Sequence, residues 1–249
     1  YLICNRGKRS VTVNLKSPRG QALIRRMARD ADVVLENFKV GTLDSLGLGY
    51  EQLSKENPRL VYCSITGFGQ TGPRAKQPAY DFMIQAMSGM MSVTGSADSG
   101  PCRVGVSIGD LGAGLYAVIG TQSALLRRAR TGEGERVDVS MLDSMASLLT
   151  FNAGIYFTTG NSPKRRGNTH ATIAPYETFK ASDGWLNIGV ANDKFWQRFC
   201  GVIERPDLAG DPRYAKAVER VRLREELVRK PACRTGTSGR CGRCAKPNS

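Results

Sequence analysis

A single aspartate in a glycine-rich segment is the residue of this sequence best suited to covalent chemistry. Asp110 directly follows Gly109, and Gly112 and Gly114 come just after it, where a helix is predicted to begin. Unpaired backbone amides and the helix dipole favour an anion at such a position. Asp110 is therefore either an ordinary N-cap or an ionised, exposed nucleophile, in which case the glycines let a bulky substrate approach the backbone.

The histidine and the cysteines show no clear pattern of a catalytic or metal-binding site. His170 is the sole histidine and has no supporting hydrolase motif, so we expect it to be structural or to contact a ligand. Cys241 and Cys244 form a C-x-x-C pair near Cys233, but a zinc site needs a fourth ligand, so we predict no metal. The other cysteines are predicted to be reduced core thiols: Cys4, Cys63, Cys102 and Cys200.

The segment GFGQTG, residues 67–72, matches the glycine template of dinucleotide-binding sites and follows a predicted strand. In those sites the loop opens a helix whose N-terminus meets the pyrophosphate, and an acidic residue ends a later strand. Here Pro73 and Pro78 follow at once, and no such acidic residue is found. We therefore expect a mobile Gly-rich loop, and an NAD-binding oxidoreductase is the least favoured function.

Charge and composition narrow the choice of partner. The 249 residues carry a formal net charge of +14, but six basic residues lie within residues 229–246, a stretch without acidic residues. The other basic residues are spread along the chain without interleaved aromatics, so we predict no nucleic-acid partner; an anionic small ligand fits as well. Apolar runs are too short to span a membrane, so we expect a soluble protein without a membrane partner. Because the chain lacks an initiator Met and a signal pattern, we expect it to begin partway through a longer protein.

The elements that must position Asp110 alternate between strands and helices. Strands are predicted at residues 8–15, 33–37, 60–66 and 136–140. Helices are predicted to start at Ser17-Pro18 and after residues 46–50, and to span residues 81–94, 111–130 and 141–157. This rhythm predicts the α/β class, as an incomplete Rossmann-like large domain with a smaller α+β domain.

Three parts of the chain are expected. Residues 1–160 are predicted to form the large domain, which ends in a long linker helix stopped by Gly160. Residues 161–228 are predicted to form the small domain, with a β-hairpin around residues 182–184 and helices over 192–203 and 214–228. Residues 229–249 have no hydrophobic periodicity, and we expect a disordered tail of non-native origin.

Seven segments occur in one order over about residues 3–228: NRGKRSVTVNLKSPRG, ADVVLENFKVGTLDSLGLGY, YCSITGFGQTGP, YDFMIQAMSGMMSVTG, VGVSIGDLGAGLYAVIG, RTGEGERVDVSMLDS and GNTHATIAPYETFKASDGW. Together they resemble family III CoA-transferases, the group of formyl-CoA and carnitine CoA-transferases. The resemblance implies that Asp110 is the catalytic nucleophile and that the large domain binds CoA, with an acyl-CoA and a carboxylic acid as substrates and no metal. It also implies a cytoplasmic enzyme whose complete form is an intertwined homodimer.

The resemblance further implies where CoA binds. The matching positions are Val13, Asn14, Leu15, Lys16, Asn37, Phe38, Lys39, Tyr80 and Asp81. Ser45 and Pro78 stand where formyl-CoA transferase has basic residues that contact CoA, so we expect Lys39, Arg9 or Lys76 to meet the phosphates. The family's opening strand and helix and its returning C-terminal part are not matched, which puts the activity of this chain alone in question.

Two branches of this family need different second groups. The α-methylacyl-CoA racemases use a His opposite the aspartate, and Tyr80 occupies that position here. A phenol with a reference pKa of about 10 is a poor proton acceptor at neutral pH. We therefore favour a CoA-transferase, with a racemase or epimerase as the alternative. The sequence most resembles members that use dicarboxylic acids such as succinate; Arg165, Arg166 and His170 then either meet a distal carboxylate or form a solvated basic loop.

Overall fold

The computed structural model describes residues 2–180 and 183–229. The chain divides into two compact units. Unit 1 comprises Tyr1–Ser92 and Cys102–Pro163, and unit 2 comprises Val93–Pro101 and Lys164–Ser249. The segment Val93–Pro101, which falls inside the predicted large domain, thus packs with the second unit. The predicted tail lies outside the described residues apart from Arg229.

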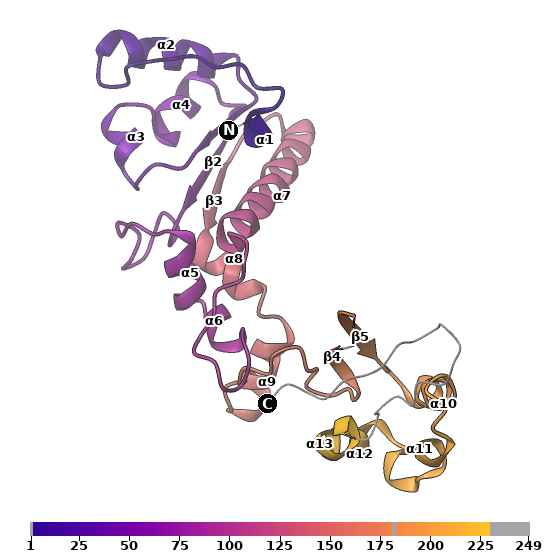
Figure 1. Cartoon of the computed structure of the whole chain (residues 1–249). Helices are drawn as coiled ribbons and strands as arrows, with labels where there is room; N and C mark the ends of the chain where they lie inside the picture. Colours follow the sequence, from indigo (N-terminus) through magenta and orange to yellow (C-terminus); the bar gives the residue numbers. More distant parts are fainter. Residues whose placement is uncertain (1, 181–182, 230–249) are drawn as a thin grey trace. The chain divides into compact units, whose positions relative to one another are not determined.

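Unit 1 is built on a parallel three-stranded sheet in the order β1-β2-β3 (Figure 1). The strands are β1 (Val33–Glu36), β2 (Val61–Thr66) and β3 (Arg136–Ser140). β2 lies in the middle and is buried along nearly its whole length, as its run of apolar and β-branched residues predicts for a strand covered on both faces. The parallel sheet with its connecting helices confirms the predicted α/β class.

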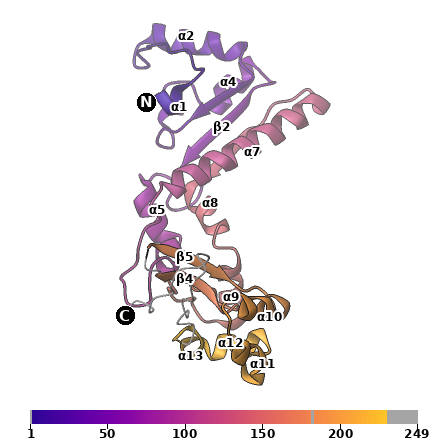
Figure 2. The same ribbon diagram turned by 45° about the vertical axis from the view of Figure 1, so that its right-hand side comes forward.

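Helices cover both faces of this sheet. On the face of Tyr62, an apolar core involves α2 (Pro18–Arg29) and α4 (Tyr50–Glu56). On the face of Cys63, a second core involves α5 (Asp81–Met87), α7 (Ile108–Thr131) and α8 (Met141–Ser147), and α7 runs along β2 and β3 (Figure 2). The remaining short helices of the region are α1 (Leu2–Asn5), α3 (Thr42–Ser45), α6 (Met90–Val93) and α9 (Phe151–Thr159). Among the described residues, no helix has both the length and the apolar character needed to cross a membrane.

The start of α2 follows the predicted capping pattern. The Ser17 hydroxyl accepts a hydrogen bond from the Gly20 backbone N–H at 3.0 Å, and Pro18 occupies the first turn. Proline suits that turn because its missing N–H has no partner within the helix anyway.

Three predicted elements of unit 1 are wrong in detail. Residues 8–15 form no strand, because a strand needs a hydrogen-bonded neighbour and none of the described segments pairs with them. The helix predicted over residues 81–94 is divided into α5 and α6 at Gly89, whose φ is 87°. The long linker helix is likewise divided into α8 and α9 before Thr150, whose φ is 45°, while Gly160 ends α9 as predicted.

Unit 2 contains an antiparallel hairpin and several helices. Strands β4 (Tyr176–Lys180) and β5 (Trp185–Gly189) confirm the predicted hairpin; Ser182 of its turn lies outside the described residues. The predicted helix over 192–203 is α10 (Asp193–Val202). The helix predicted over 214–228 is instead divided into three pieces: η1 (Pro212–Tyr214), α12 (Ala217–Arg222) and α13 (Arg224–Arg229). One further helix, α11 (Pro206–Gly210), had no clear sequence signal.

A fully buried arginine connects several segments of this unit through hydrogen bonds. The Arg220 side chain has no solvent exposure, and its guanidinium lies 5.2 Å from the ring centre of Trp196. It donates hydrogen bonds to the carbonyl oxygens of Ala174 (3.0 Å) and Tyr214 (2.8 Å) and to the Asp193 carboxylate (3.0 Å). Arg220 thus connects the segment before β4 with the helices that follow β5.

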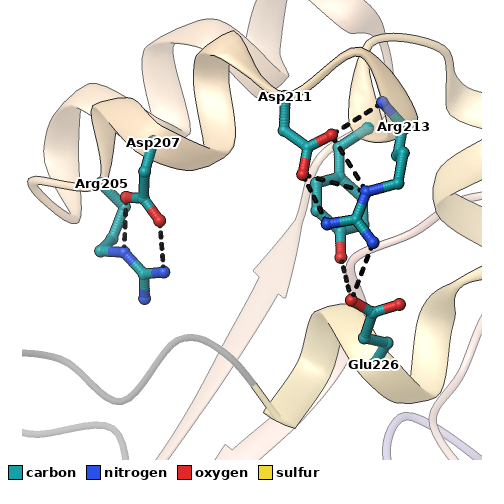
Figure 3. A network of polar contacts seen from close by, with 6 residues as sticks. Arg205, Asp207, Asp211, Arg213 and Glu226 are labelled. Atoms are coloured by element: carbon teal, nitrogen blue, oxygen red, sulfur yellow. Dashed lines mark hydrogen bonds and ion pairs between the residues drawn. The ribbon is translucent and has the colours of Figure 1, made fainter.

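Further polar contacts lie on the surface of unit 2 (Figure 3). Arg213 contacts Asp211 at 2.7 Å and Glu226 at 3.3 Å, while Arg205 forms a separate pair with Asp207 at 2.6 Å. Solvent-exposed pairs of this kind each contribute little to stability, so we assign no functional role to them.

The four cysteines predicted to be core thiols differ in burial. Cys63 and Cys200 are free and buried, as predicted, and Cys102 is half-buried. Cys4 is exposed, so the prediction that it lies in a core was wrong. In the part of the chain that the structure describes, no group of three or more His, Cys, Asp or Glu residues is placed to hold a metal ion.

Candidate active site

The beginning of α7 positions Asp110. The helix starts at Ile108 after the N-cap residue Ser107, so Asp110 lies in its first turn and the N-cap interpretation is wrong. Ser107 makes no capping hydrogen bond through its side chain. Instead, the Asp81 carboxylate of α5 accepts a hydrogen bond from the Gly109 backbone N–H at 2.8 Å. Any residue larger than glycine at position 109 would crowd this contact, because an added Cβ would lie 3.0 Å from Asp81 Oδ1.

A second contact fixes the segment that leads into α7. The other oxygen of Asp81 accepts a hydrogen bond from Gln85 Nε2 at 2.8 Å. Gln85 is fully buried, and its Oε1 accepts a hydrogen bond from the Val104 backbone N–H at 2.8 Å. Both oxygens of Asp81 are therefore engaged in holding the start of α7, and with it the backbone of Asp110.

The surroundings of Asp110 make its carboxylate more basic. Partial burial and, secondarily, the negative charge of Asp81 raise the pKa of Asp110 above its ordinary value. The positive end of α7 acts in the opposite direction and favours the ionised form. Its side chain remains exposed, and among the described residues none donates a hydrogen bond to its oxygens. The carboxylate is thus accessible and free to form a bond to a ligand.

Asp110 lines a cleft of about 520 Å³ at the carboxyl end of the sheet. Parallel sheets commonly bind ligands at this edge because the loops that follow the strands meet there. The cleft also contains the residues after β1, the end of β2 and the beginning of α5. Its polar and aromatic residues include Asn37, Phe38, Lys39, Thr66, Lys76, Tyr80 and Asp81.

Comparison with known proteins identifies the family. The model of the family described as CoA-transferase family III matches residues 1–238. The chain belongs to CoA-transferase family III. It is 45% identical over 227 residues to succinate–glutarate CoA-transferase of Agrobacterium fabrum, covering 91% of this chain and 57% of that protein. It is also 45% identical over 228 residues to acetyl-CoA:oxalate CoA-transferase of Acetobacter aceti, covering 91% of this chain and 59% of that protein.

A solved structure agrees with this assignment to family III. The crystal structure of a CAIB/BAIF family protein from Brucella suis matches with a TM-score of 0.79 and 48% sequence identity. The match covers 90% of this chain and 59% of that one. The chain therefore spans somewhat more than half the length of the family III relatives it matches.

The structure unites two of the three predicted CoA-contacting stretches of this family III chain. Residues 37–39 and the pair Tyr80 and Asp81 share the cleft of Asp110. Residues 13–16 do not line it. Val13 and Asn14 line a separate cavity of about 790 Å³ beside α2. Leu15 packs against the core on the Tyr62 face, and Lys16 is exposed.

The loop that follows β2 is held across the sheet. The Gln70 backbone N–H donates to the Asp138 carboxylate at 2.9 Å, and the Gln70 side chain accepts from Arg136 at 2.7 Å. The loop then continues to Asp81 without opening a helix, as Pro73 and Pro78 predicted. Thr66 and Met141 also line the cleft. The sequence did not mark them as site residues; it placed Thr66 at the end of one predicted strand and Met141 directly after another.

The other candidate residues lie in unit 2. Arg165 donates a hydrogen bond to the Ser99 carbonyl at 3.1 Å, and the His170 ring lies against the Tyr176 ring in a tilted arrangement with ring centres 5.2 Å apart. His170 Nδ1 accepts a hydrogen bond from the Thr172 backbone N–H at 3.2 Å. Arg166 lines a separate cavity beside the junction of α12 and α13.

Proposed function

We propose that this protein transfers CoA from an acyl-CoA to a carboxylic acid through a covalent intermediate on Asp110. The observation that carries the proposal is the exposed, more basic Asp110 carboxylate at the start of α7, in one cleft with residues 37–39 and Tyr80. Membership of CoA-transferase family III supports the reaction type. The relatives named for succinate, glutarate and oxalate support a dicarboxylic acid as acceptor or donor.

The proposed reaction has four steps. The Asp110 carboxylate attacks the thioester carbonyl, and CoA leaves as its thiolate, so that a mixed anhydride remains on Asp110. The thiolate then attacks the aspartyl carbonyl, which releases the donor acid and gives an aspartyl-CoA thioester. The acceptor carboxylate attacks this thioester and forms a second anhydride with release of the thiolate. Attack of the thiolate on the acceptor's carbonyl gives the new acyl-CoA and restores the Asp110 carboxylate.

Several residues of the cleft have roles in this scheme. Lys39 and Lys76 supply positive charge for the phosphates of CoA. Asn37 is oriented by the hydrogen bond that its side-chain nitrogen donates to the Ile65 carbonyl at 2.6 Å. The Gly109 N–H is already bound to Asp81, so oxyanion stabilisation falls to other donors.

The family resemblance also supports further CoA contacts and a dimeric complete protein. Residues 13–16 contact CoA, Val13 and Asn14 from the cavity beside α2, and Tyr80 and Asp81 border the reacting group. The complete protein is a cytoplasmic homodimer. A racemase is less well supported, because the cleft presents Tyr80, 76% exposed, where a second base would be needed.

Transfer and racemisation can be separated by isotope exchange in the full-length protein. Racemisation removes a proton from the α-carbon, whereas CoA transfer leaves that proton in place. We expect CoA to move between carboxylic acids in a panel of donors and acceptors, with no α-deuterium entering a 2-methylacyl-CoA in D₂O, as mass spectrometry would measure. Rapid deuterium uptake without transfer to any acid would assign the racemase branch, and tight NAD binding without CoA binding would support an oxidoreductase.

Asp81→Asn is expected to extend transfer activity to lower pH. Burial is the larger cause of the raised pKa of Asp110 and stays in the variant, whereas the secondary contribution from the Asp81 charge is lost. The pKa of Asp110 therefore falls, and because only the carboxylate attacks, the acid limb of kcat/KM against pH moves to lower pH. The substituted amide side chain retains an oxygen that can accept from the Gly109 N–H. Asp143→Asn serves as the control, because Asp143 is an exposed residue in the first turn of α8; it is expected to leave the acid limb of the pH profile unchanged. If the acid limb of Asp81→Asn stays in place or moves to higher pH, the charge of Asp81 does not raise the pKa of Asp110.

A further inference from the structure

The hydroxyl of Thr66 is buried without a hydrogen-bond partner. The residue is 6% exposed, and within the described part of the chain no group accepts from or donates to its Oγ1. A buried hydroxyl that makes no hydrogen bond destabilises the fold. Folded proteins satisfy most such groups, so an unpaired hydroxyl in a residue that lines a cleft is a candidate for a ligand contact.

The fold places Thr66 at the candidate active site. Thr66 is the last residue of β2, at the carboxyl end of the central strand, and it lines the cleft that contains Asp110. The next residue, Gly67, lies so close to Ala79 that an added Cβ would sit 2.3 Å from the Ala79 side chain. The segment before α5 therefore passes tightly against the end of β2, next to Thr66.

Two neighbouring polar side chains of the cleft, Asp81 and Asn37, already have partners within the protein. Both oxygens of Asp81 accept hydrogen bonds, and the side-chain nitrogen of Asn37 donates to a backbone carbonyl. Lys39 and Lys76 are exposed cations suited to phosphates. A buried neutral hydroxyl is better matched to a neutral carbonyl oxygen, because a buried charge would need an opposite charge beside it. The thioester arm of acyl-CoA carries amide and thioester carbonyls of this kind.

We propose that Thr66 Oγ1 donates a hydrogen bond to a carbonyl oxygen of the thioester arm of bound acyl-CoA. The proposal rests on the proposed function, because it needs CoA in this cleft. It makes Thr66 a binding residue that the sequence alone did not mark.

The same strand supplies a matched control. Ser64 lies two residues earlier on the same face of β2, has no solvent exposure, and also has an unpartnered hydroxyl. It does not line the cleft. A general effect of losing a buried hydroxyl from β2 would appear in both residues, whereas a ligand contact would appear only at Thr66.

The test compares Thr66→Val, Thr66→Ser and Ser64→Ala in the full-length protein. Valine keeps the shape and removes the hydroxyl, and serine keeps the hydroxyl. Calorimetry with CoA and with acetyl-CoA gives the Kd, and thermal unfolding without ligand gives the Tm. We expect Thr66→Val to bind acetyl-CoA about tenfold more weakly, as the loss of one hydrogen bond to a buried acceptor predicts, with an unchanged or higher Tm. Thr66→Ser and Ser64→Ala are expected to bind within about twofold of wild type.

The two ligands locate the acceptor. Equal weakening of CoA and acetyl-CoA assigns an amide carbonyl of the arm, and weakening of acetyl-CoA alone assigns the thioester carbonyl. Wild-type affinity in Thr66→Val overturns the proposal while leaving the proposed function intact, as does equal weakening in Ser64→Ala. If wild type binds no CoA and transfers none, the proposed function fails and the role of Thr66 fails with it.

Discussion

Asp110→Ala is expected to abolish CoA transfer in the full-length protein, with kcat lowered by about four orders of magnitude or more. The scheme forms every covalent intermediate on this carboxylate, and loss of a nucleophile commonly has effects of this size. Steady-state assays with acyl-CoA and a carboxylic acid measure the change. CoA binding is expected to persist, because Asp110 is one of many residues that line the cleft.

The covalent step can be tested separately. Incubating wild type with acyl-CoA and then with hydroxylamine is expected to modify Asp110, which peptide mass spectrometry would identify. Asp143→Ala, in the first turn of α8, serves as the control and is expected to keep normal turnover and normal labelling. Near-normal transfer by Asp110→Ala, or labelling at another carboxylate, would show that the nucleophile lies elsewhere.

Arg220→Ala is expected to destabilise unit 2 by about 2–5 kcal/mol, because it leaves carbonyl oxygens unpaired and removes the packing of a fully buried side chain. The substitution removes the donor to the Ala174 and Tyr214 carbonyls and leaves Asp193 with the longer contact to Lys216 at 3.9 Å. It also removes the cation beside Trp196. Urea unfolding followed by tryptophan fluorescence measures the free energy of unfolding.

A neighbouring arginine provides the comparison. Arg222 lies in the same helix, but its side chain is 75% exposed and forms an ion pair with Glu219 on the surface. Arg222→Ala is therefore expected to change the free energy of unfolding by less than about 0.5 kcal/mol. If both variants lose stability equally, burial of Arg220 does not explain its role.

Local sequence signals predicted the elements whose determinants are local. Ser17 and Pro18 mark the start of α2, and the apolar run of β2 marks a strand buried on both faces. The helix breaks at Gly89 and Thr150 depend on positive φ values that the apolar spacing does not reveal. The segment 8–15 has strand-like composition, but pairing depends on a neighbour, which composition cannot supply.

The candidate site was predictable to a similar extent. The glycines around Asp110 and the family resemblance singled out that residue, and the resemblance also gave residues 37–39 and Tyr80. The sequence could not show that Asp81 holds the Gly109 N–H, because the two residues meet only when α5 packs against α7. The unpaired hydroxyl of Thr66 is equally invisible, since an absent hydrogen bond can be recognised only once every neighbour has been placed.

The parallel arrangement of β1, β2 and β3 has a consequence for how the cleft forms during folding. Parallel neighbours cannot be joined by a tight turn, and here α5, α6 and α7 all lie in the chain between β2 and β3. Contacts between such distant segments require loop closure before they are made, and they form slowly. The residues around Asp110 come from segments that follow each of the three strands, so the cleft exists only after β1, β2 and β3 have paired. A ligand of this cleft therefore binds the folded chain and not the unfolded one, and by mass action it stabilises unit 1 as a whole.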